Sequence, residues 1–169
     1  MFSKNDYVFY ESGGICRILD VLVSPLEGMP ADKTYYVLQS LHDNNGVMYI
    51  PVDSQSVFLR RLMNREEASA FLDRVTTVEP ILESGAKQLR NRYVESMRTH
   101  EPLEWARVIK TVRVRMEALT GRTQRLSETE RSFYESARRF LATELALAFA
   151  WSEEQANRYL EERLSEQAC

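Results

Sequence analysis

The 169-residue sequence predicts an α+β fold, in which a small all-β module over residues 1–60 precedes an all-α bundle of about five helices over residues 61–169. Apolar residues fall in short β-rich runs before about residue 60 and recur at helical spacing after it. Helix-start signals stand at Asn64, Ser127 and Ser152, each followed three residues later by Glu or Gln as in a capping box. With 44% hydrophobic and 28% charged residues, the composition is typical of a globular chain.

Four short runs rich in β-branched and aromatic residues predict the strands of the first module. Gly, Pro, Asn and Asp separate these runs, which cover residues 7–10, 15–22, 35–41 and 47–52. Between the last two runs lies Asn44-Asn45-Gly46, whose residue types tolerate the positive φ of a tight turn. We therefore expect the last two runs to pair as an antiparallel hairpin.

Helical periodicity predicts the second part of the chain as five segments, over residues 65–76, 82–99, 103–120, 128–150 and 153–166. Pro80 and Pro102 interrupt the pattern, because proline lacks the backbone N–H that a helix interior needs. Gly121 suits the carboxyl end of the third helix, where a positive φ is common.

Apolar stripes on the third and fourth predicted helices indicate the core of the bundle. The stripe on the third helix consists of Ala106, Ile109, Val112, Met116 and Leu119. The stripe on the fourth consists of Phe133, Ala137, Phe140, Leu141, Leu145 and Ala148. Basic residues project elsewhere around the third helix and predict a basic surface on the bundle, formed by Arg107, Lys110, Arg113 and Arg115.

The formal net charge of -3, from 22 basic and 25 acidic residues, conceals a division along the chain. Residues 1–80 carry 7 basic and 11 acidic residues, residues 81–150 carry 13 and 9, and residues 151–169 carry 2 and 5. The middle segment therefore has a charge of +4 between two acidic segments. Such asymmetry predicts an anionic partner for the middle segment.

The motifs of common enzyme classes are missing from the sequence. It contains no phosphate-binding glycine-rich loop, no Gly-x-Ser-x-Gly element and no His-Glu-x-x-His helix. His42 and Asp43 could form an acid and base pair, but the exposure of a loop beside a turn is the more ordinary explanation. We expect no enzymatic activity, no cofactor and no metal.

The cysteines and the apolar runs indicate the compartment. Cys16 and Cys169 are too few and too far apart in sequence for a disulfide framework, so a reducing cytoplasm is expected. A buried Cys16 on a strand fits better than a reactive thiol. The longest apolar stretch, residues 145–151, is too short to span a bilayer.

Several short motifs follow one another in an order that carries a family resemblance. Residues 2–10, the Gly13-Gly14 turn, the Gly28 loop, residues 35–38 and residues 48–52 resemble the amino-terminal module shared by CarD, CdnL and transcription-repair coupling factor. Downstream motifs are similar to the last long helix of CarD-type proteins, and they cover residues 126–130, 137–138 and 141–146. The resemblance to the CarD/CdnL family thus extends over nearly the whole chain.

The resemblance implies a Tudor-like module that docks on the RNA polymerase β subunit, followed by a helical domain near upstream promoter DNA. Such proteins regulate initiation by tuning the stability of the open complex. In this family the module contacts the polymerase partly through a strand edge, by β-augmentation. Met48, Tyr49 and Ile50 occupy the corresponding strand, and alternation places Tyr49 on the opposite face from the other two. Tyr49 is the best contact candidate, while Met48 and Ile50 could equally well fill the small barrel.

The helical domain of well-studied CarD proteins carries a tryptophan that wedges into the minor groove at the melted promoter. The aligned position here, before Asn91-Arg92-Tyr93, is Leu89 or its neighbour Gln88. Leucine can insert at a base step, but it gives up the stacking area of an indole. Trp105 and Trp151 do not align with the wedge, and their helical settings favour partial core burial.

Basic residues remain as candidates for contacts with DNA phosphates. Lys87, Arg90 and Arg92 surround the wedge position, and Arg131 and Arg138 match basic positions of the family helix. Lysine and arginine attract phosphates without reading sequence, although each residue could also belong to a solvated helix face. Because the whole chain is acidic, we expect weak, non-sequence-specific contact with promoter DNA that depends on tethering by the polymerase.

Two other functions fit the same sequence. The helical domain of a polymerase-docking protein could bind other proteins and make little DNA contact. Alternatively, the chain could be a general adaptor whose basic face meets acidic proteins. In each case we expect a monomer.

Overall fold

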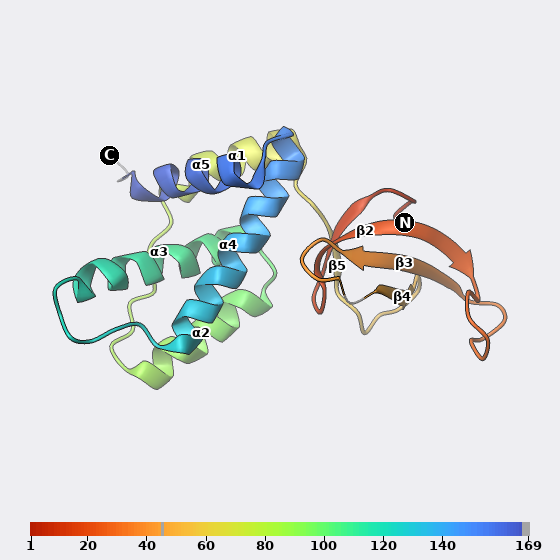
Figure 1. Cartoon of the computed structure of the whole chain (residues 1–169), viewed down its shortest axis with the longest axis horizontal. Coiled ribbons are helices and arrows are strands. Elements are labelled where there is room, and N and C mark those ends of the chain that lie inside the picture. The colour runs from red at the N-terminus through yellow and green to blue at the C-terminus, as the bar shows by residue number, and fades with distance from the viewer. Residues whose placement is uncertain (45, 167–169) are drawn as a thin grey trace. The chain divides into compact units, whose positions relative to one another are not determined.

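The computed structural model describes residues 1–44 and 46–166, and the chain divides into two compact units, Met1–Leu62 and Met63–Cys169 (Figure 1). Within the described residues the first unit forms a five-stranded antiparallel sheet and the second forms five helices. This arrangement confirms the predicted α+β class. No helix in the described part of the chain is long and apolar enough to cross a membrane.

The sheet of the first unit has two edge strands. Its strands are β1 Tyr7–Tyr10, β2 Gly14–Val23, β3 Thr34–Ser40, β4 Val47–Pro51 and β5 Leu59–Arg61. They lie in the order β4-β3-β2-β1-β5, and each neighbouring pair is antiparallel. The register of β2 shifts between Ile18 and Asp20, and such a bulge bends a strand and increases its twist.

Side chains from all five strands meet in one apolar core cluster. Its buried members come from β1 to β4 and are Val8, Cys16, Ile18, Tyr36, Leu38 and Ile50, and Leu59 of β5 packs against them. Because both edge strands contact the same cluster, the sheet curls around its core as a small barrel does. No ladder joins β4 to β5 among the residues that the structure describes, so the hydrogen-bonded sheet stays open there.

Strands β3 and β4 pair antiparallel, as the hairpin signal predicts. The connection over residues 41–46 is longer than a tight turn, and Gly46 has a φ of +90°. Asn45, the middle residue of the predicted turn, lies outside the described residues. The sequence patterns do not predict β5, because its three residues include Arg60 and Arg61 and show no apolar alternation. Pairing with β1 places this segment in the sheet.

The predicted number of helices is confirmed for the described part of the second unit. The helices are α1 Arg65–Val75, α2 Ala86–Arg98, α3 Pro102–Leu119, α4 Glu128–Phe149 and α5 Glu153–Ser165. All three predicted capping boxes are present, since the side chains of Asn64, Ser127 and Ser152 each accept a hydrogen bond from the backbone N–H three residues later. Pro102 occupies the first turn of α3, where its missing N–H costs no hydrogen bond.

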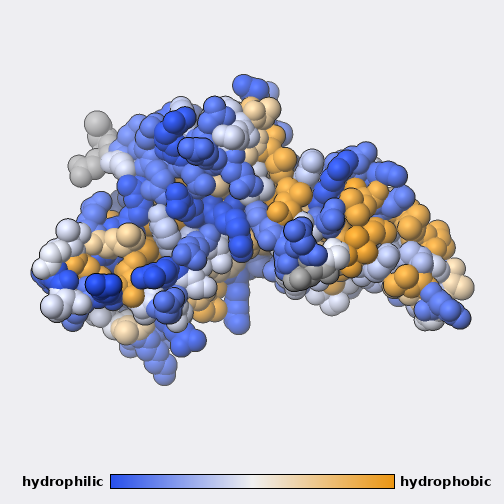
Figure 2. All heavy atoms as spheres, in the orientation of Figure 1, coloured by the Kyte–Doolittle hydropathy of each residue, from blue (hydrophilic) through white to orange (hydrophobic). Residues whose placement is uncertain are grey.

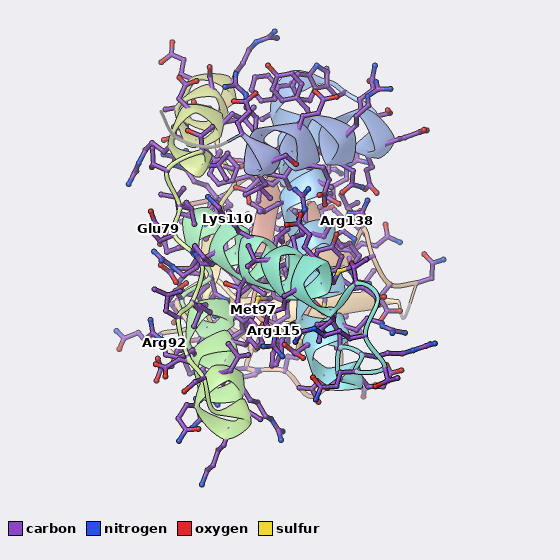
Figure 3. The ribbon with its side chains drawn as sticks, turned by 90° about the vertical axis from the view of Figure 1, so that its left-hand side faces the viewer. Glu79, Arg92, Met97, Lys110, Arg115 and Arg138 are labelled. Carbon is purple, nitrogen blue, oxygen red and sulfur yellow. The ribbon has the colours of Figure 1, made fainter. Side chains whose placement is uncertain are left out.

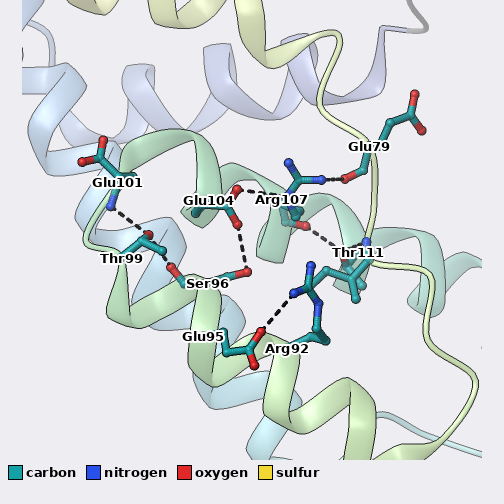
Figure 4. A network of polar contacts seen from close by, with 10 residues as sticks. Glu79, Arg92, Glu95, Ser96, Thr99, Glu101, Glu104, Arg107 and Thr111 are labelled. Carbon is teal, nitrogen blue, oxygen red and sulfur yellow. Dashed lines mark hydrogen bonds and ion pairs between the residues drawn. The ribbon is translucent and has the colours of Figure 1, made fainter.

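Helix α2 begins later than the predicted start at residue 82, because tertiary hydrogen bonds hold the segment before it in an irregular conformation. The Ile81 N–H donates to Thr111 Oγ1 at 2.8 Å. The guanidinium of Arg107 donates to the backbone oxygen of Glu79 at 2.9 Å (Figure 4). Both partners lie on α3, distant in sequence, so local patterns carry no signal for these bonds.

The core of the bundle forms around α4, which packs against the other four helices (Figure 1). The fully buried residues of the two predicted stripes are Ala106, Ile109, Val112, Ala137, Leu141 and Leu145. Phe133, Phe140 and Ala148 are half-buried. The prediction is wrong at the end of α3, where Met116 is 47% exposed and Leu119 is half-buried. The apolar stripe of α3 therefore emerges at the surface in its last turns.

The two tryptophans lie in different settings within this unit. Trp105 is fully buried and packs against Phe140 with 5.3 Å between ring centroids. Trp151 is half-buried, stacked on Phe149 and close to Tyr159. Core burial is thus confirmed for Trp105, and Trp151 belongs to an aromatic cluster nearer the surface.

Candidate functional site

The outer edge of β4 offers unpaired backbone groups. The N–H of Val52 donates to the backbone oxygen of Thr34 at 2.9 Å, which fixes the alternation of the β3 and β4 ladder. The backbone N–H and C=O groups of Met48 and Ile50 therefore bond β3, while those of Val47 and Tyr49 point away from it. Pro51 shares this outward alternation, and its missing N–H costs the sheet no bond. Among the described strands, none pairs with this edge.

Met48 and Ile50 belong to the module's core. Ile50 is buried in the core cluster, and Met48 packs against the cluster from a half-buried position. The absence of a side chain at Gly13 leaves room for Met48. A Cβ on Gly13 would lie 2.9 Å from the Met48 methyl and 3.0 Å from the Tyr10 ring, which is too close. The glycine turn after β1 thereby makes room for the side chain that anchors β4 to the core.

Tyr49 lies on the opposite face of β4 from Met48 and Ile50, as strand alternation requires. It stands directly across from Val37 of β3 in the ladder. Its side chain is half-buried. A partner strand that adds to β4 would therefore meet the backbone of Tyr49 along the edge and its ring on one face.

A groove of about 340 Å³ in the helical unit brings two of the predicted basic residues together at the start of α2. Lys87 and Arg90 both line it, and their spacing of three residues puts them on one face of the helix. Both are exposed, and neither forms an ion pair with a residue in the described ranges. Arg92 lies on the side of α2 away from α4 and pairs with Glu95 at 2.9 Å (Figures 3 and 4).

Leu89 is only 4% exposed, so the residue that aligns with the family's tryptophan wedge belongs to the core of the helical unit. Its side chain touches the groove but exposes too little surface in this conformation to insert at a base step. Gln88, the other aligned position, is exposed. The amphipathic register of α2 explains the difference, because Leu89 and the fully buried Tyr93 are four residues apart on the inward face.

The floor of the same groove contains an ion pair that sequence reasoning does not identify. Arg115 of α3 donates to both carboxylate oxygens of Glu130 on α4, at 2.5 and 3.4 Å. The hydroxyl of Tyr93 on α2 donates to the same carboxylate at 3.2 Å. Figure 3 shows Arg115 between α2 and α4. The three residues, which we call the α2-α3-α4 triad, therefore join three helices at the groove that Lys87 and Arg90 line.

The triad also perturbs its own ionisable groups. Burial would raise the pKa of the Glu130 carboxyl, but hydrogen bonds from Arg115, from the Ser127 backbone and from Tyr93 outweigh it and lower this pKa. Burial and the nearby Glu130 charge raise the pKa of Tyr93. Glu130 is therefore a carboxylate at neutral pH, and Tyr93 is its neutral donor. The sequence signals Glu130 only as the partner of Ser127 in a capping box.

The two predicted basic residues on α4 differ in their surroundings. The guanidinium of Arg131 lies 3.9 Å from the Glu128 carboxylate, and both side chains are exposed. Arg138 lies 3.6 Å from Glu161 of α5, which also accepts a hydrogen bond from Tyr134 at 3.2 Å. Arg138 thus takes part in the contact between α4 and α5, whereas Arg131 is open to solvent.

The predicted basic surface along α3 needs correction. Arg107, Arg113 and Arg115 each form an ion pair within the helical unit, with Glu104 at 3.3 Å, Glu161 at 2.9 Å and Glu130 at 2.5 Å respectively. Ser96 extends the first of these pairs toward α2, because its hydroxyl donates to Glu104 (Figure 4). Hydrophilic residues cover much of the visible face of this unit (Figure 2). The three arginines of α3 nevertheless act largely by pairing with carboxylates inside the helical unit.

Comparison with known protein families confirms the resemblance drawn from the sequence. Residues 2–63 match the CarD-like/TRCF RID domain, and residues 79–161 match the CarD C-terminal domain. The two matches cover most of the chain and follow one another in the order of the two structural units. A search among curated proteins found no significant match.

Proposed function

The chain belongs to the CarD/CdnL family of RNA polymerase-interacting transcription factors, and we propose that it binds the polymerase β subunit through β4 and modulates promoter open-complex stability through its helical unit. The observation that carries the first half is the unpaired edge of β4. The second half rests on Lys87, Arg90 and Arg131, which lie exposed on the helical unit. The same proposal takes the protein as a cytoplasmic monomer that catalyses no reaction.

The β4 edge is suited to β-augmentation by an extended segment of the β subunit. Val47 and Tyr49 supply two donors and two acceptors to an added strand, whereas the Pro51 carbonyl already accepts a hydrogen bond from the Ser54 N–H at 3.1 Å. The proline also limits how far an added strand can extend, because it offers no donor. Main-chain hydrogen bonds would provide affinity, and the half-buried ring of Tyr49 would provide a side-chain anchor beside them.

Binding of the full chain to a purified β-subunit fragment tests the docking surface. Tyr49→Ala should weaken binding by about 1 to 2 kcal/mol, since tyrosines are frequent interface anchors. Tyr49→Pro should weaken binding further, because proline also removes the outward-facing backbone N–H of this residue, which β3 does not use. Tyr7→Ala provides the matched control, as Tyr7 is an exposed tyrosine on the interior strand β1. Equal binding by both Tyr49 variants and the Tyr7 variant would exclude docking through β4.

For the DNA contact, the structure favours some predicted residues over others. Lys87 and Arg90 share one exposed face of α2 without internal counterions in the described part of the chain, and Arg131 is open to solvent. Arg92 and Arg138 lie 2.9 and 3.6 Å from their carboxylate partners, closer than the 3.9 Å between Arg131 and the exposed Glu128, so their contribution to a phosphate-binding surface should be smaller. Each phosphate contact releases counterions, which makes the contact sensitive to salt.

Open-complex lifetime measured over a range of salt concentrations tests the DNA contact. The double variant Lys87→Gln, Arg90→Gln should reduce the slope of the logarithm of lifetime against the logarithm of salt concentration. The reduction should be about one unit for each phosphate contact that the substitutions remove. Arg98→Gln with Arg158→Gln is the control, because both residues are exposed and have no ion-pair partner in the described ranges. If the first double variant retains polymerase binding and the full salt dependence, DNA contact through α2 is refuted.

One set of observations favours the second candidate function, a polymerase-docking protein whose helical unit binds proteins. Leu89 is buried, and the arginines of α3 together with Arg138 are paired internally. Promoter-opening kinetics separate the two functions. A docking-only protein would bind polymerase and leave the opening rate and the open-complex lifetime unchanged.

A further inference from the structure

A second groove, of about 520 Å³, lies where α3 ends and α4 begins. This volume falls within the range of roughly 300 to 1,000 Å³ that is usual for ligand-binding pockets. Part of its lining comes from residues 120–126, which connect the two helices. In Figure 2 apolar surface shows between hydrophilic residues at this end of the helical unit.

The wall of the groove is apolar because the core stripe of α3 continues past the point where other helices cover it. Met116 and Leu119 occupy the last turns of this stripe, and Leu126 and Tyr134 face the groove from the connection and from α4. Met116 is 47% exposed, whereas Ile109 and Val112 of the same stripe are fully buried. The wall is therefore a solvent-facing extension of the core that an apolar side chain of a partner could cover.

The rim of the groove is cationic. Arg122, Arg125 and Arg131 line it together with a single acidic residue, Glu135. Arg122 and Arg125 are exposed and pair with no carboxylate in the part of the chain that the structure describes. Arg131 lies 3.9 Å from Glu128, whose side chain is 90% exposed, so this pair competes with solvent and can exchange partners. The rim therefore complements carboxylates.

The start of α4 and the apolar wall of the groove favour a peptide over a nucleic acid. The first turn of α4 already has its own acidic residues, Glu128 and Glu130, and its capping box uses the N–H groups that a phosphate would need. A wall of methionine and leucine side chains gives a phosphate backbone no hydrogen bond, but it suits the anchors of an amphipathic peptide.

We propose that this groove docks an acidic amphipathic peptide segment of a protein partner. One or more large apolar side chains of the segment cover Met116, Leu119 and Leu126, and flanking carboxylates pair with Arg122 and Arg125. The groove shares Arg131 with the proposed DNA contacts, but its apolar wall and its other two arginines, Arg122 and Arg125, are separate from the β4 edge and from Lys87 and Arg90. The proposal therefore adds a protein partner to the proposed polymerase and DNA contacts.

Selection from a random peptide library displayed on phage, with the full-length protein as target, identifies the ligand class. Enriched peptides should combine aspartate or glutamate with leucine, phenylalanine or tryptophan at helical spacing. A synthetic copy of an enriched peptide should then shift the methyl resonance of Met116 in protein labelled at its methionine methyl groups. The methyl groups of Met29 and Met48, which belong to the first unit, serve as internal references and should not move.

Two variants and a matched control locate the site. Arg122→Glu with Arg125→Glu, and separately Met116→Ser, should each weaken peptide binding by at least about tenfold. Arg98→Glu with Arg158→Glu makes the same charge change away from the groove and should leave binding intact. All these residues are exposed, so tryptophan fluorescence should report an unchanged fold for each variant.

Other outcomes overturn the proposal. It fails if no acidic amphipathic peptide is enriched, or if the groove variants and the control bind the enriched peptide equally. It also fails if duplex DNA, and no peptide, shifts the Met116 methyl, because the groove would then be a nucleic-acid surface. None of these measurements uses polymerase or promoter complexes, so their failure is distinguishable from failure of the proposed function.

Discussion

Loss of the Glu130 charge should destabilise the helical unit, because Glu130 is the acceptor that joins α2, α3 and α4. The substitution Glu130→Gln keeps the size of the side chain and an acceptor for the capping box, and it removes the charge that Arg115 and Tyr93 contact. A hydrogen bond to a charged group contributes about 1.5 to 3 kcal/mol to stability. The Arg115 side chain is 40% exposed, so solvent screening reduces this value, and we expect a loss of about 1 to 2 kcal/mol.

Urea unfolding followed by tryptophan fluorescence measures this loss in the full-length protein. Both tryptophans lie in the helical unit, so the signal reports that unit by itself. Glu128→Gln is the matched control, since Glu128 stands in the same first turn of α4 with a side chain that is 90% exposed. Its effect should stay within about 0.5 kcal/mol. Equal midpoints for the two variants would refute a stabilising role for the triad.

The dependence on pH gives a second measurement of the same charge. The contacts in the folded protein lower the pKa of Glu130 below its ordinary value of 4.5, so folding favours the charged form. The stabilisation is present above the ordinary pKa and is lost as pH falls through the folded value. The difference between wild-type protein and Glu130→Gln should therefore be constant near neutral pH and shrink as the pH falls below the ordinary pKa of 4.5 and through the lower pKa of the folded protein. A difference that does not change with pH would assign the effect to packing.

Two further predictions concern buried residues. Leu89→Trp should destabilise the helical unit by about 1 to 3 kcal/mol, as measured by circular dichroism in urea, because Leu89 lies in a packed core. The same change at the exposed neighbour, Gln88→Trp, should have little effect, and comparable stability of the two variants would contradict the burial of Leu89. Burial raises the pKa of the Cys16 thiol to about 11, so iodoacetamide at pH 8 should leave Cys16 unmodified in folded protein and alkylate it in urea. Mass spectrometry of the peptide that contains Cys16 measures both states, and equal alkylation rates would show that the thiol is accessible.

Features that depend on neighbouring residues in sequence could be predicted well. The boxes at Asn64, Ser127 and Ser152 involve residues three positions apart, so the start of each of these helices is visible in the sequence. The pairing of β3 with β4 depends on alternation and on a nearby turn, and it too was visible. The family motifs identified β4 as the strand of interest, and the structure adds which of its residues have outward-facing backbone groups.

Features that depend on distant partners could not be predicted. Nothing near Arg115 in sequence indicates that Glu130 and Tyr93 bind it, because the three residues meet only when three helices pack. The stripe on α3 has the same spacing at Val112 and at Met116, yet the first is buried and the second is exposed, since the packing of other helices ends between them. The apolar period locates a face of a helix, and tertiary packing decides how much of that face is covered.

Internal pairing of arginines changes what the charge of the middle segment can do. Ion pairs within the helical unit hold Arg92, Arg107, Arg113, Arg115 and Arg138 within 4 Å of a carboxylate, and a closed pair exerts little field beyond the Debye length of about 8 Å. The exposed basic residues without such partners include Lys87 and Arg90 at the start of α2, and Arg122 and Arg125 before α4.

If these two pairs serve different partners, their substitutions should act independently. Charge removal at Lys87 and Arg90 should reduce the effect on promoter complexes and leave peptide binding unchanged, whereas charge removal at Arg122 and Arg125 should do the reverse. In each assay the fourfold variant should match the sum of the two double variants within about 0.5 kcal/mol, as expected for sites with no shared partner. A coupling well above this value would mean that both pairs contact one ligand, and the two grooves would then form a single binding surface.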